Sequence, residues 1–422
     1  MAAGDPPPAG DPPARRIILV DADAFFVAVA RLVDPAGAGR ARLLIVGGGG
    51  TRGVVCSASY ETREFGVRSA MPTARALRLC PGAMVVPVPH SVCGQKSREI
   101  RAALERFSPV VQGASIDEWY VDLSGTEALY AHASLRDVAH RIRAAVQAET
   151  GLTVSIGGAT NRLVAKIAVE RAKPKPGTHA DGVFVVAPGQ ESAFLETVAL
   201  ADIPLVGPRF RESLASRGLR TVSDVLAVDL ASLTRMLGAR AARWLHDRVR
   251  GIDDSAVRSR DMARSLSHEE TFGHDLSSDE DLDRELVHLV TRVAHDLRHD
   301  GLMARTVTLK LRDGDFTTRS AGRTLPAAVL SDRVILTTAR ALLARLRRAR
   351  RVPARLLGVA LTGLEDADVD TQLSLFAGDV TSPVESQKDR ALSQAIDAVR
   401  QRFGRDAVVP GRLADGKRRL RR

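Results

Sequence analysis

The sequence predicts an α+β protein of several domains, organised around a ferredoxin-like sheet. At 422 residues the chain exceeds the size of one ordinary hydrophobic core, so roughly two to four domains are expected. When residues 24–88 are set aside, the first part of the chain reads strand, helix, strand, strand, helix, strand. This order is typical of the ferredoxin-like split unit. A second stretch, residues 263–365, again combines strands with long helices.

The elements of the first unit follow from short apolar runs that end at turn residues and from longer stretches of helical periodicity. Residues 24–88 carry their own pattern of strands and helices, with a glycine-rich turn at 47–50. No Gly-Lys-Ser/Thr follows these glycines, so they predict a hairpin turn and not a nucleotide-binding loop. The predicted strands are 16–21, 42–46, 53–57, 84–88, 110–115, 119–123 and 152–156, and the predicted helices are 25–32, 72–81, 91–107, 134–150 and 161–172.

Three carboxylates are predicted to meet at one edge of the sheet. In the ferredoxin-like unit the first and third strands are adjacent and antiparallel, which brings Asp21 next to Asp117 and Glu118. Like charges at contact distance cannot all stay ionised unless protons or cations neutralise them. Two divalent ions roughly 3.5–4 Å apart would do so and would suit phosphoryl displacement, and oxygen-only ligands indicate Mg²⁺ or Mn²⁺. The spacing fits equally well if Asp21 caps the next helix and the other two acids are turn residues.

The rest of the chain divides by composition. Residues 1–14 are mostly Pro, Ala, Gly and Asp and cannot bury a core, so they are expected to be disordered. Residues 181–250 predict a small helical region, and residues 251–262 a linker. The later predicted elements are a helix at 279–300, a strand at 304–312, a helix at 327–349, a strand at 356–364, a polar linker at 366–386, a helix at 387–403 and a basic tail to residue 422.

The charge of the chain indicates an anionic partner. A net charge of +11 and a pI near 10.2 favour nucleic acid over a membrane surface, because no basic amphipathic anchor is evident. The alternative is that an arginine-rich surface only reflects the composition of the genome. Aromatic residues make up only 4% of the chain, so phosphate contacts are expected to matter more than base stacking.

The remaining composition indicates a cytoplasmic protein. No stretch reaches transmembrane length, and the first apolar run is interrupted at once by Asp21 and Asp23, unlike a signal peptide. The three cysteines, Cys56, Cys80 and Cys93, form no C-x-x-C pair and no zinc spacing, so reduced thiols are expected.

Several motifs, in order along residues 16–365, resemble the Y-family DNA polymerases, most of all their bacterial polymerase IV branch. Residues 20–26 (VDADAFF) and 115–118 (SIDE) resemble the two catalytic motifs of that family, and residues 58–72 (ASYETREFGVRSAMP) resemble its fingers segment. Further similarities lie at 165–168 and 172–174 in the palm, and at 267–272, 309–312 and 355–359 in the C-terminal DNA-binding domain.

The resemblance implies a palm at 15–23 and 88–180, fingers at 24–87, a thumb at 181–250 and a little-finger domain at 263–365. It implies low-fidelity translesion synthesis without proofreading, by two-metal transfer from a deoxynucleoside triphosphate (dNTP) to a primer 3′-hydroxyl. The protein is expected to act as a monomer in DNA repair. By the same resemblance, Asp21, Asp117, Glu118 and the Ala22 carbonyl hold the metals, Tyr60, Arg63 and Lys173 bind the triphosphate, and Phe26 excludes a 2′-hydroxyl.

A short peptide in the polar linker also resembles a known motif. Two leucines and a phenylalanine in a polar stretch need an apolar pocket elsewhere. Residues 372–376, with Gln372, Leu373, Leu375 and Phe376, resemble the peptide by which bacterial polymerases bind the sliding clamp, the β subunit.

The chain departs from the family pattern at several positions. Trp119 follows the acidic pair where a smaller residue is common, and Arg162 and Glu64 replace usual lysines. Residues 205–208 (LVGP) resemble a helix-hairpin-helix but lack its first glycine, which leaves phosphate binding there open. Two other classes of protein were weighed: a catalytically silent relative that acts as a scaffold, and another ferredoxin-like nucleotidyl enzyme such as a cyclase. A silent scaffold would be supported if one of the three acids were absent, and all three are present. A cyclase would need no basic C-terminal domain.

Overall fold

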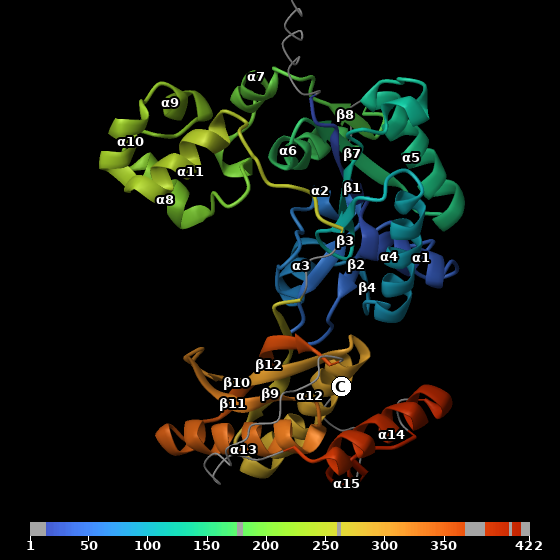
Figure 1. Cartoon of the computed structure of the whole chain (residues 1–422), viewed down its shortest axis with the longest axis vertical. Coiled ribbons are helices and arrows are strands. Elements are labelled where there is room, and N and C mark those ends of the chain that lie inside the picture. The colour runs from blue at the N-terminus through green and yellow to red at the C-terminus, as the bar shows by residue number, and fades with distance from the viewer. Residues whose placement is uncertain (1–13, 175–179, 260–262, 368–384, 405–406, 415–422) are drawn as a thin grey trace, which may run out of the picture. The chain divides into compact units, whose positions relative to one another are not determined.

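The computed structural model describes residues 14–174, 180–259, 263–367, 385–404 and 407–414 (Figure 1). The chain forms two compact units, Met1–Asp261 and Met262–Arg422. No helix in these described ranges is long and apolar enough to cross a membrane.

The first unit is built on a five-stranded sheet in the order β5-β6-β1-β7-β8. Strand β1 pairs antiparallel with β6 on one side and with β7 on the other, which confirms the ferredoxin-like arrangement. Strand β8, parallel to β7, was not predicted, because three residues are too few to show an alternating pattern. The strands are β1 (Ile17–Ala22), β5 (Val111–Gly113), β6 (Glu118–Asp122), β7 (Val154–Ala159) and β8 (Val183–Val185).

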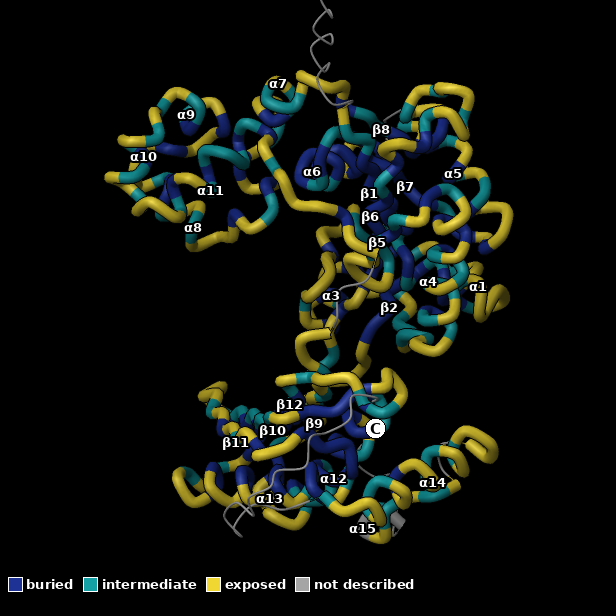
Figure 2. The backbone as a smooth tube through the Cα atoms, viewed as in Figure 1, coloured by how far each residue is buried: buried dark blue, intermediate teal, exposed yellow. Residues whose placement is uncertain are grey.

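Helices cover both faces of this sheet, and β1 is buried along its whole length (Figure 2). Ile18 and Val20 point into the core that is shared with α1, α4 and α5, whereas Ile17 and Leu19 pack against α6. The four helices are α1 (Phe25–Val33), α4 (His90–Glu105), α5 (Leu135–Thr150) and α6 (Arg162–Ala172), close to the predicted ranges.

Helix α6 lies unusually close to the sheet because β7 carries a glycine at the contact. A Cβ atom on Gly157 would lie 2.3 Å from the Ala165 carbonyl oxygen and 2.3 Å from the Val169 nitrogen. Only glycine permits this approach of two backbones. The close contact sets the position of α6, and therefore of its lysines, relative to β1.

A second, three-stranded sheet in the order β3-β2-β4 is inserted after α1. The predicted hairpin turn at 47–50 is confirmed, since β2 and β3 pair antiparallel around it. Ser59 caps the short helix α2, which was not predicted, by accepting a hydrogen bond from the Thr62 amide. The elements are β2 (Leu44–Gly47), β3 (Val55–Ala58), α2 (Tyr60–Glu64), α3 (Thr73–Leu79) and β4 (Met84–Val86).

Beyond β8 the first unit is helical, as the sequence predicted. A separate apolar core includes Leu195, Leu214, Leu233 and Leu245. The helices are α7 (Glu191–Glu196), α8 (Pro208–Ala215), α9 (Val222–Leu226), α10 (Leu230–Leu237) and α11 (Ala239–Val249).

The second unit is a four-stranded antiparallel sheet, in the order β11-β10-β12-β9, packed against two long helices. The helix predicted from residue 327 begins instead at Asp332, because residues up to Val329 pair with β10 as strand β11. Pro326 is tolerated there because β11 is an edge strand. The elements are β9 (Ser265–Leu276), α12 (Asp279–His299), β10 (Leu302–Asp313), β11 (Thr318–Val329), α13 (Asp332–Ala349), β12 (Ala354–Asp366), α14 (Gln387–Phe403) and α15 (Gly411–Ala414).

Candidate active site

The predicted adjacency of the first and third strands is confirmed, and it brings the three acids near one another along the backbone. Asp21, near the end of β1, is paired in register with Glu118, the first residue of β6. The Ala22 amide donates a hydrogen bond to the Asp117 carbonyl oxygen (2.9 Å), which joins the turn before β6 to β1. By the alternation of the strands, Asp21 and Glu118 share the face of the sheet that α6 covers. The first and third strands therefore bring acids distant in sequence together.

Asp21 does not cap the following helix. The cap of α1 is Ala24, whose side chain makes no capping bond and whose backbone is left-handed, with φ 44°. Asp21 is instead 6% exposed and lies within the sheet. The capping alternative that the spacing allowed is therefore wrong for this residue. Asp117 does belong to a turn, where its carboxylate accepts a hydrogen bond from the Ser115 hydroxyl.

Each acid of the pair faces a lysine, Lys166 within α6 or Lys173 at its C-terminal cap. The Lys166 ammonium donates to Glu118, and the Lys173 ammonium lies 3.0 Å from Asp21 and 2.7 Å from Glu170. The two lysines are seven residues apart, two turns of helix, so they reach the sheet from the same side of α6. Lys166 lies within a motif that the sequence analysis quoted, but it was not among the predicted site residues. Its spacing from Lys173 is the signal that was missed.

The charges of the site are strongly perturbed. Burial raises the pKa of Asp21 to about 7, an effect that Lys173 opposes and the charge of Glu118 reinforces. Burial alone would lower the pKa of Lys173, but the Asp21 and Glu170 carboxylates outweigh it and raise the pKa. Lys173 therefore offsets only part of the cost of burying the innermost carboxylate, and a further cation would favour its charged form.

The donor set fits a hard divalent cation in its chemistry, since Asp21, Asp117, Glu118 and the Ala22 carbonyl supply oxygen only. Among the described residues, however, no group of three or more His, Cys, Asp or Glu side chains is arranged to hold a metal ion. The reason lies in the two lysines, which take up the carboxylates of Asp21 and Glu118.

Tyr60 and Arg63 lie on α2, next to these charges. The Arg63 guanidinium lies 4.8 Å from the centre of the Tyr60 ring and donates to the Ala58 carbonyl at 2.9 Å. Burial raises the pKa of Tyr60, with Asp23 and Asp21 acting in the same direction and Arg63 and Lys173 against it. The Tyr60 hydroxyl therefore lies within the field of the acids and the lysine.

Two neighbours in the first motif have distinct surroundings. Asp23 is buried and accepts a hydrogen bond from the Ser155 hydroxyl (2.7 Å), which ties the end of β1 to β7. Phe26 is only partly buried, with its ring 5.7 Å from that of Phe25, which lies in the core.

The departures from the family pattern have structural explanations. Trp119 is 2% exposed and fills the core beneath the sheet. Arg162 stacks on Tyr120 at 4.4 Å and donates to the Ala256 carbonyl. Leu205 replaces the missing glycine before α8 with φ 73°, a left-handed backbone that favours glycine. Glu64 is exposed and the structure gives no reason for it.

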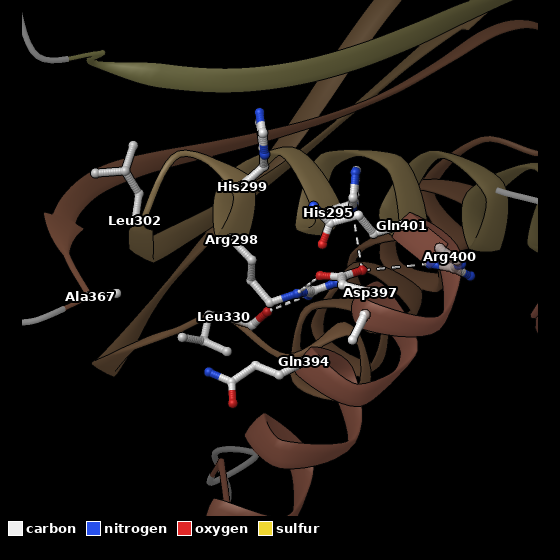
Figure 3. Close-up of a pocket in the computed structure, with 11 residues that line it drawn as sticks. His295, Arg298, His299, Leu302, Leu330, Ala367, Gln394, Asp397, Arg400 and Gln401 are labelled. Atoms are coloured by element: carbon white, nitrogen blue, oxygen red, sulfur yellow. Dashed lines mark hydrogen bonds and ion pairs between the residues drawn. The ribbon is translucent and has the colours of Figure 1, made fainter. Parts of the chain in front are cut away.

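A cavity of about 570 Å³ in the second unit is unrelated to the acids of the first. It lies between α12 and α14, where Arg298 donates to Asp397 at 2.6 Å and His295 contacts the same carboxylate at 3.1 Å (Figure 3). Arg298 also donates to Asp332 and to the Leu330 carbonyl. The contacts of Asp397 with Arg298 and His295 fasten α14 to α12.

Comparison with known proteins identifies the chain. Residues 20–170 match the impB/mucB/samB family, residues 263–375 match the C-terminal domain of that family, and residues 201–253 match the DNA polymerase-iota thumb domain. DNA polymerase IV of Caulobacter vibrioides is 37% identical over 401 residues, covering 95% of this chain and 94% of its own. DNA polymerase IV of Gluconobacter oxydans is 39% identical over 355 residues, covering 84% of this chain and 96% of its own.

Solved structures agree on the fold. A Y-family DNA polymerase chimera covers 82% of this chain and 98% of its own, with a TM-score of 0.71 and 23% identity. Sheet, acids and matched domains together define a DNA-directed DNA polymerase. The chain belongs to the Y family of these enzymes, alongside the DNA polymerases IV named above, and its activity is translesion synthesis in DNA repair. Polymerases of this family use divalent metal ions.

Proposed function

We propose that the protein copies damaged DNA with low fidelity and without proofreading, by two-metal transfer of a nucleotide from a dNTP to a primer 3′-hydroxyl. The observation that carries this proposal is the pairing of Asp21 with Glu118 on the face covered by α6, where each acid forms an ion pair with a lysine. Paired carboxylates of this kind suit cations that act on the attacking and leaving oxygens of a phosphoryl transfer.

The metal ligands in this proposal are Asp21, Asp117, Glu118 and the Ala22 carbonyl, and Mg²⁺ suits their oxygen atoms, with Mn²⁺ as the alternative. Two such ions, when bound, would activate the primer hydroxyl and stabilise the charge that develops on the phosphates. The raised pKa of Asp21 supports this assignment, because a buried carboxylate that must stay ionised needs more positive charge than one lysine supplies.

The lysines have a second role in this proposal. Lys173 is tied to Asp21 and Glu170, so it becomes available for another anion when cations take up the charge of Asp21. Together with Tyr60 and Arg63 it would bind the incoming triphosphate, whose charge suits two cations and a hydroxyl donor. Lys166 would hold Glu118 in place until the site is loaded.

Phe26 is proposed to exclude ribonucleotides. Its ring is only partly buried and lies at the start of α1. Phe26 follows Asp23, the second acid of the catalytic motif, by three residues. Packing on Phe25 holds the ring in a fixed place, where a 2′-hydroxyl would collide with it.

The matched ranges support a domain assignment. We assign the palm to 15–23 and 88–180 together with β8, the fingers to 24–87, the thumb to the remainder of 181–250 and the little finger to 263–365. Residues 372–376 lie outside the described residues, and we propose that they bind the sliding clamp. We further propose a monomer that acts on primer–template DNA in the cytoplasm.

Primer extension tests this function against its alternatives. The protein should extend a primer on a template that carries a lesion. When each of the four dNTPs is supplied alone, it should also be incorporated at a measurable rate opposite template bases that do not pair with it. A scaffold would bind the DNA without extending it, and a cyclase would consume triphosphate without a primer. Release of a mismatched 3′-terminal nucleotide would contradict the absence of proofreading.

A further inference from the structure

A short loop joins β10 to β11 (Figure 1). It contains Phe316, whose ring is exposed and whose backbone is strained. Phe316 is 63% exposed, and its φ of 67° places it in the left-handed region, which is costly for a bulky residue. Of the phenylalanines that the structure describes, only Phe65, Phe316 and Phe403 are exposed, and Phe65 less so than the other two. A strained conformation persists only where its surroundings enforce it, so the turn needs a physical explanation.

The turn is held by its own hydrogen bonds. The Phe316 amide donates to the Asp313 carbonyl and the Asp313 amide to the Thr317 carbonyl, both at 2.9 Å. The Gly314 amide donates to the Pro353 carbonyl at 3.1 Å, and a Cβ on Gly314 would lie 2.3 Å from an Asp275 oxygen. The backbone has no space in which to relax, so the ring is presented in a fixed place.

Arginines neutralise the acids of the turn. Arg350 donates to Asp313 at 2.8 Å and to Asp315 at 2.6 Å, and Arg319 donates to Asp313 at 2.8 Å. Asp313 is fully buried under these contacts. The two carboxylates therefore do not repel an anion that approaches the ring.

Two further arginines lie at the ring and the turn. The Arg355 guanidinium lies 4.6 Å from the centre of the Phe316 ring, and Arg312 donates to the Thr318 hydroxyl at 2.8 Å. Four arginines against three aspartates, Asp275 included, leave the turn with a net positive charge. An aromatic face beside guanidinium groups is the chemistry that binds nucleotides, with the ring stacking on a base and the cations meeting phosphate.

We propose that Phe316 stacks on an unpaired base of the DNA that the enzyme copies, with Arg355 beside the ring. Bases within a duplex have both faces covered by their neighbours, so only an unpaired base offers a face to the ring. A protein partner is less suitable, because the residues around the ring are aspartates, arginines and threonines and not an apolar patch. The proposal rests on DNA as the substrate, and it adds an aromatic contact to the phosphate contacts that the composition predicted.

The test is equilibrium binding of the full-length protein to fluorescent DNA, without dNTP or metal. The probes are a duplex with a single-stranded template extension and the same duplex with blunt ends. Phe316→Ala should weaken binding to the extended DNA about tenfold, the range expected for one base stacked on an aromatic side chain, and leave blunt duplex within about twofold. Phe316→Trp should bind as the wild type does, and Phe403→Ala, which removes a comparably exposed ring from the same unit, should have no effect.

Abasic sites placed one at a time along the extension identify the stacked base. In the wild type one abasic position should cost about as much affinity as Phe316→Ala, and in Phe316→Ala that position should become neutral. Phe316→Asn distinguishes the loss of the ring from a loss of stability, because asparagine suits a left-handed backbone. This variant should keep or raise the melting temperature and should lose the same affinity for extended DNA as Phe316→Ala.

Equal losses on extended and blunt DNA, no loss on either, or additive effects of the abasic site and the substitution would each overturn the proposal. Primer extension by the same wild-type preparation keeps the two questions apart. If the wild type extends primers but Phe316→Ala binds both DNAs normally, the stacking contact is wrong and the polymerase activity stands.

Discussion

The Lys173 ammonium lies 3.0 Å from the Asp21 carboxylate, and this ion pair joins the end of α6 to the central strand of the sheet. Burial raises the pKa of Asp21 to about 7 even with this lysine beside it. The pKa of Asp21 therefore lies near neutral pH, and any cation that enters the site shifts the acid to its charged form. The ion pair keeps the acid in place before substrate and metal arrive.

Removal of the other two acids should stop the reaction. Asp117→Ala and Glu118→Ala should each lower the rate of primer extension at least about a hundredfold, because the charge that develops on the reacting phosphate loses its stabilisation. DNA affinity should change little, since neither acid is needed to hold the duplex. Rates are measured in single-turnover extension, with Glu149→Ala, a surface acid of α5 that pairs with Arg106, as the control. Normal extension by either variant would place the metal site elsewhere.

Phe26→Ala should admit ribonucleotides. The ratio of ribonucleotide to deoxynucleotide incorporation should rise by about tenfold or more, because the space that a 2′-hydroxyl needs is no longer filled, while use of dNTPs drops far less. Steady-state kinetics with matched pairs of nucleotides measures the ratio. Phe65→Ala, which removes an exposed ring at the C-terminal end of α2, is the matched control. An unchanged ratio would make Phe26 a packing residue.

DNA affinity should fall steeply with salt. Release of counterions gives a slope of about −0.9 per phosphate contact in a plot of log affinity against log salt concentration for duplex DNA. A protein shortened to residues 1–261, the first compact unit, should show a flatter slope, because the basic residues of the second unit are gone. Anisotropy titrations over a range of salt concentrations give both slopes. Identical slopes would assign the phosphate contacts to the first unit alone.

The peptide at 372–376 should carry clamp binding. Replacement of Leu375 and Phe376 by alanine should abolish stimulation by the sliding clamp and leave clamp-free extension unchanged. Each large apolar side chain that enters a pocket contributes about 1.5–3 kcal/mol, so the pair is essential to the affinity. Calorimetry with the purified clamp measures the difference, and Val380→Ala in the same stretch is the control. Equal affinities of wild type and variant would leave the segment as a linker only.

Leu205 is the site of a stabilising substitution. Leu205→Gly should raise the free energy of unfolding of the thumb helices by roughly 0.5–1 kcal/mol, because relief of the left-handed backbone outweighs the added freedom of the unfolded chain. In a Trp119→Phe background the remaining tryptophan, Trp244 of α11, reports this transition in urea. Leu129→Gly provides the control: Leu129 is as exposed, but its φ is not positive, so glycine should only destabilise there.

The sequence predicted the core of the site because two regular patterns converge on it. The apolar runs at 16–21 and 119–123, together with the ferredoxin-like order of strands, bring Asp21 next to Asp117 and Glu118 without any knowledge of side-chain contacts. The long helices of both units were predicted for a similar reason, since apolar residues recur at helical spacing over many turns. The match of α14 with the predicted range 387–403 is the clearest case.

The rest depended on tertiary contacts. Strand β11 contains Gly322, Pro326 and three alanines, which give no alternating pattern, and it is a strand only because β10 lies beside it. Lys166 and Lys173 reach the acids only because Gly157 lets α6 approach β7. A single glycine in the sequence does not predict such a contact. The ring of Phe316 was missed because its exposure depends on a turn that distant arginines hold.

The central position of β1 has a consequence for the dynamics of the enzyme. Every residue of β1 is buried, and hydrogen bonds to β6 and β7 flank the strand on both sides. Strands at the edge of a sheet open by local fluctuation, whereas a central strand exchanges its amides only when most of the domain unfolds. Asp21 is therefore carried on one of the last segments to open. The loops and helices that meet DNA and nucleotides can fluctuate freely while the geometry of the acids is preserved.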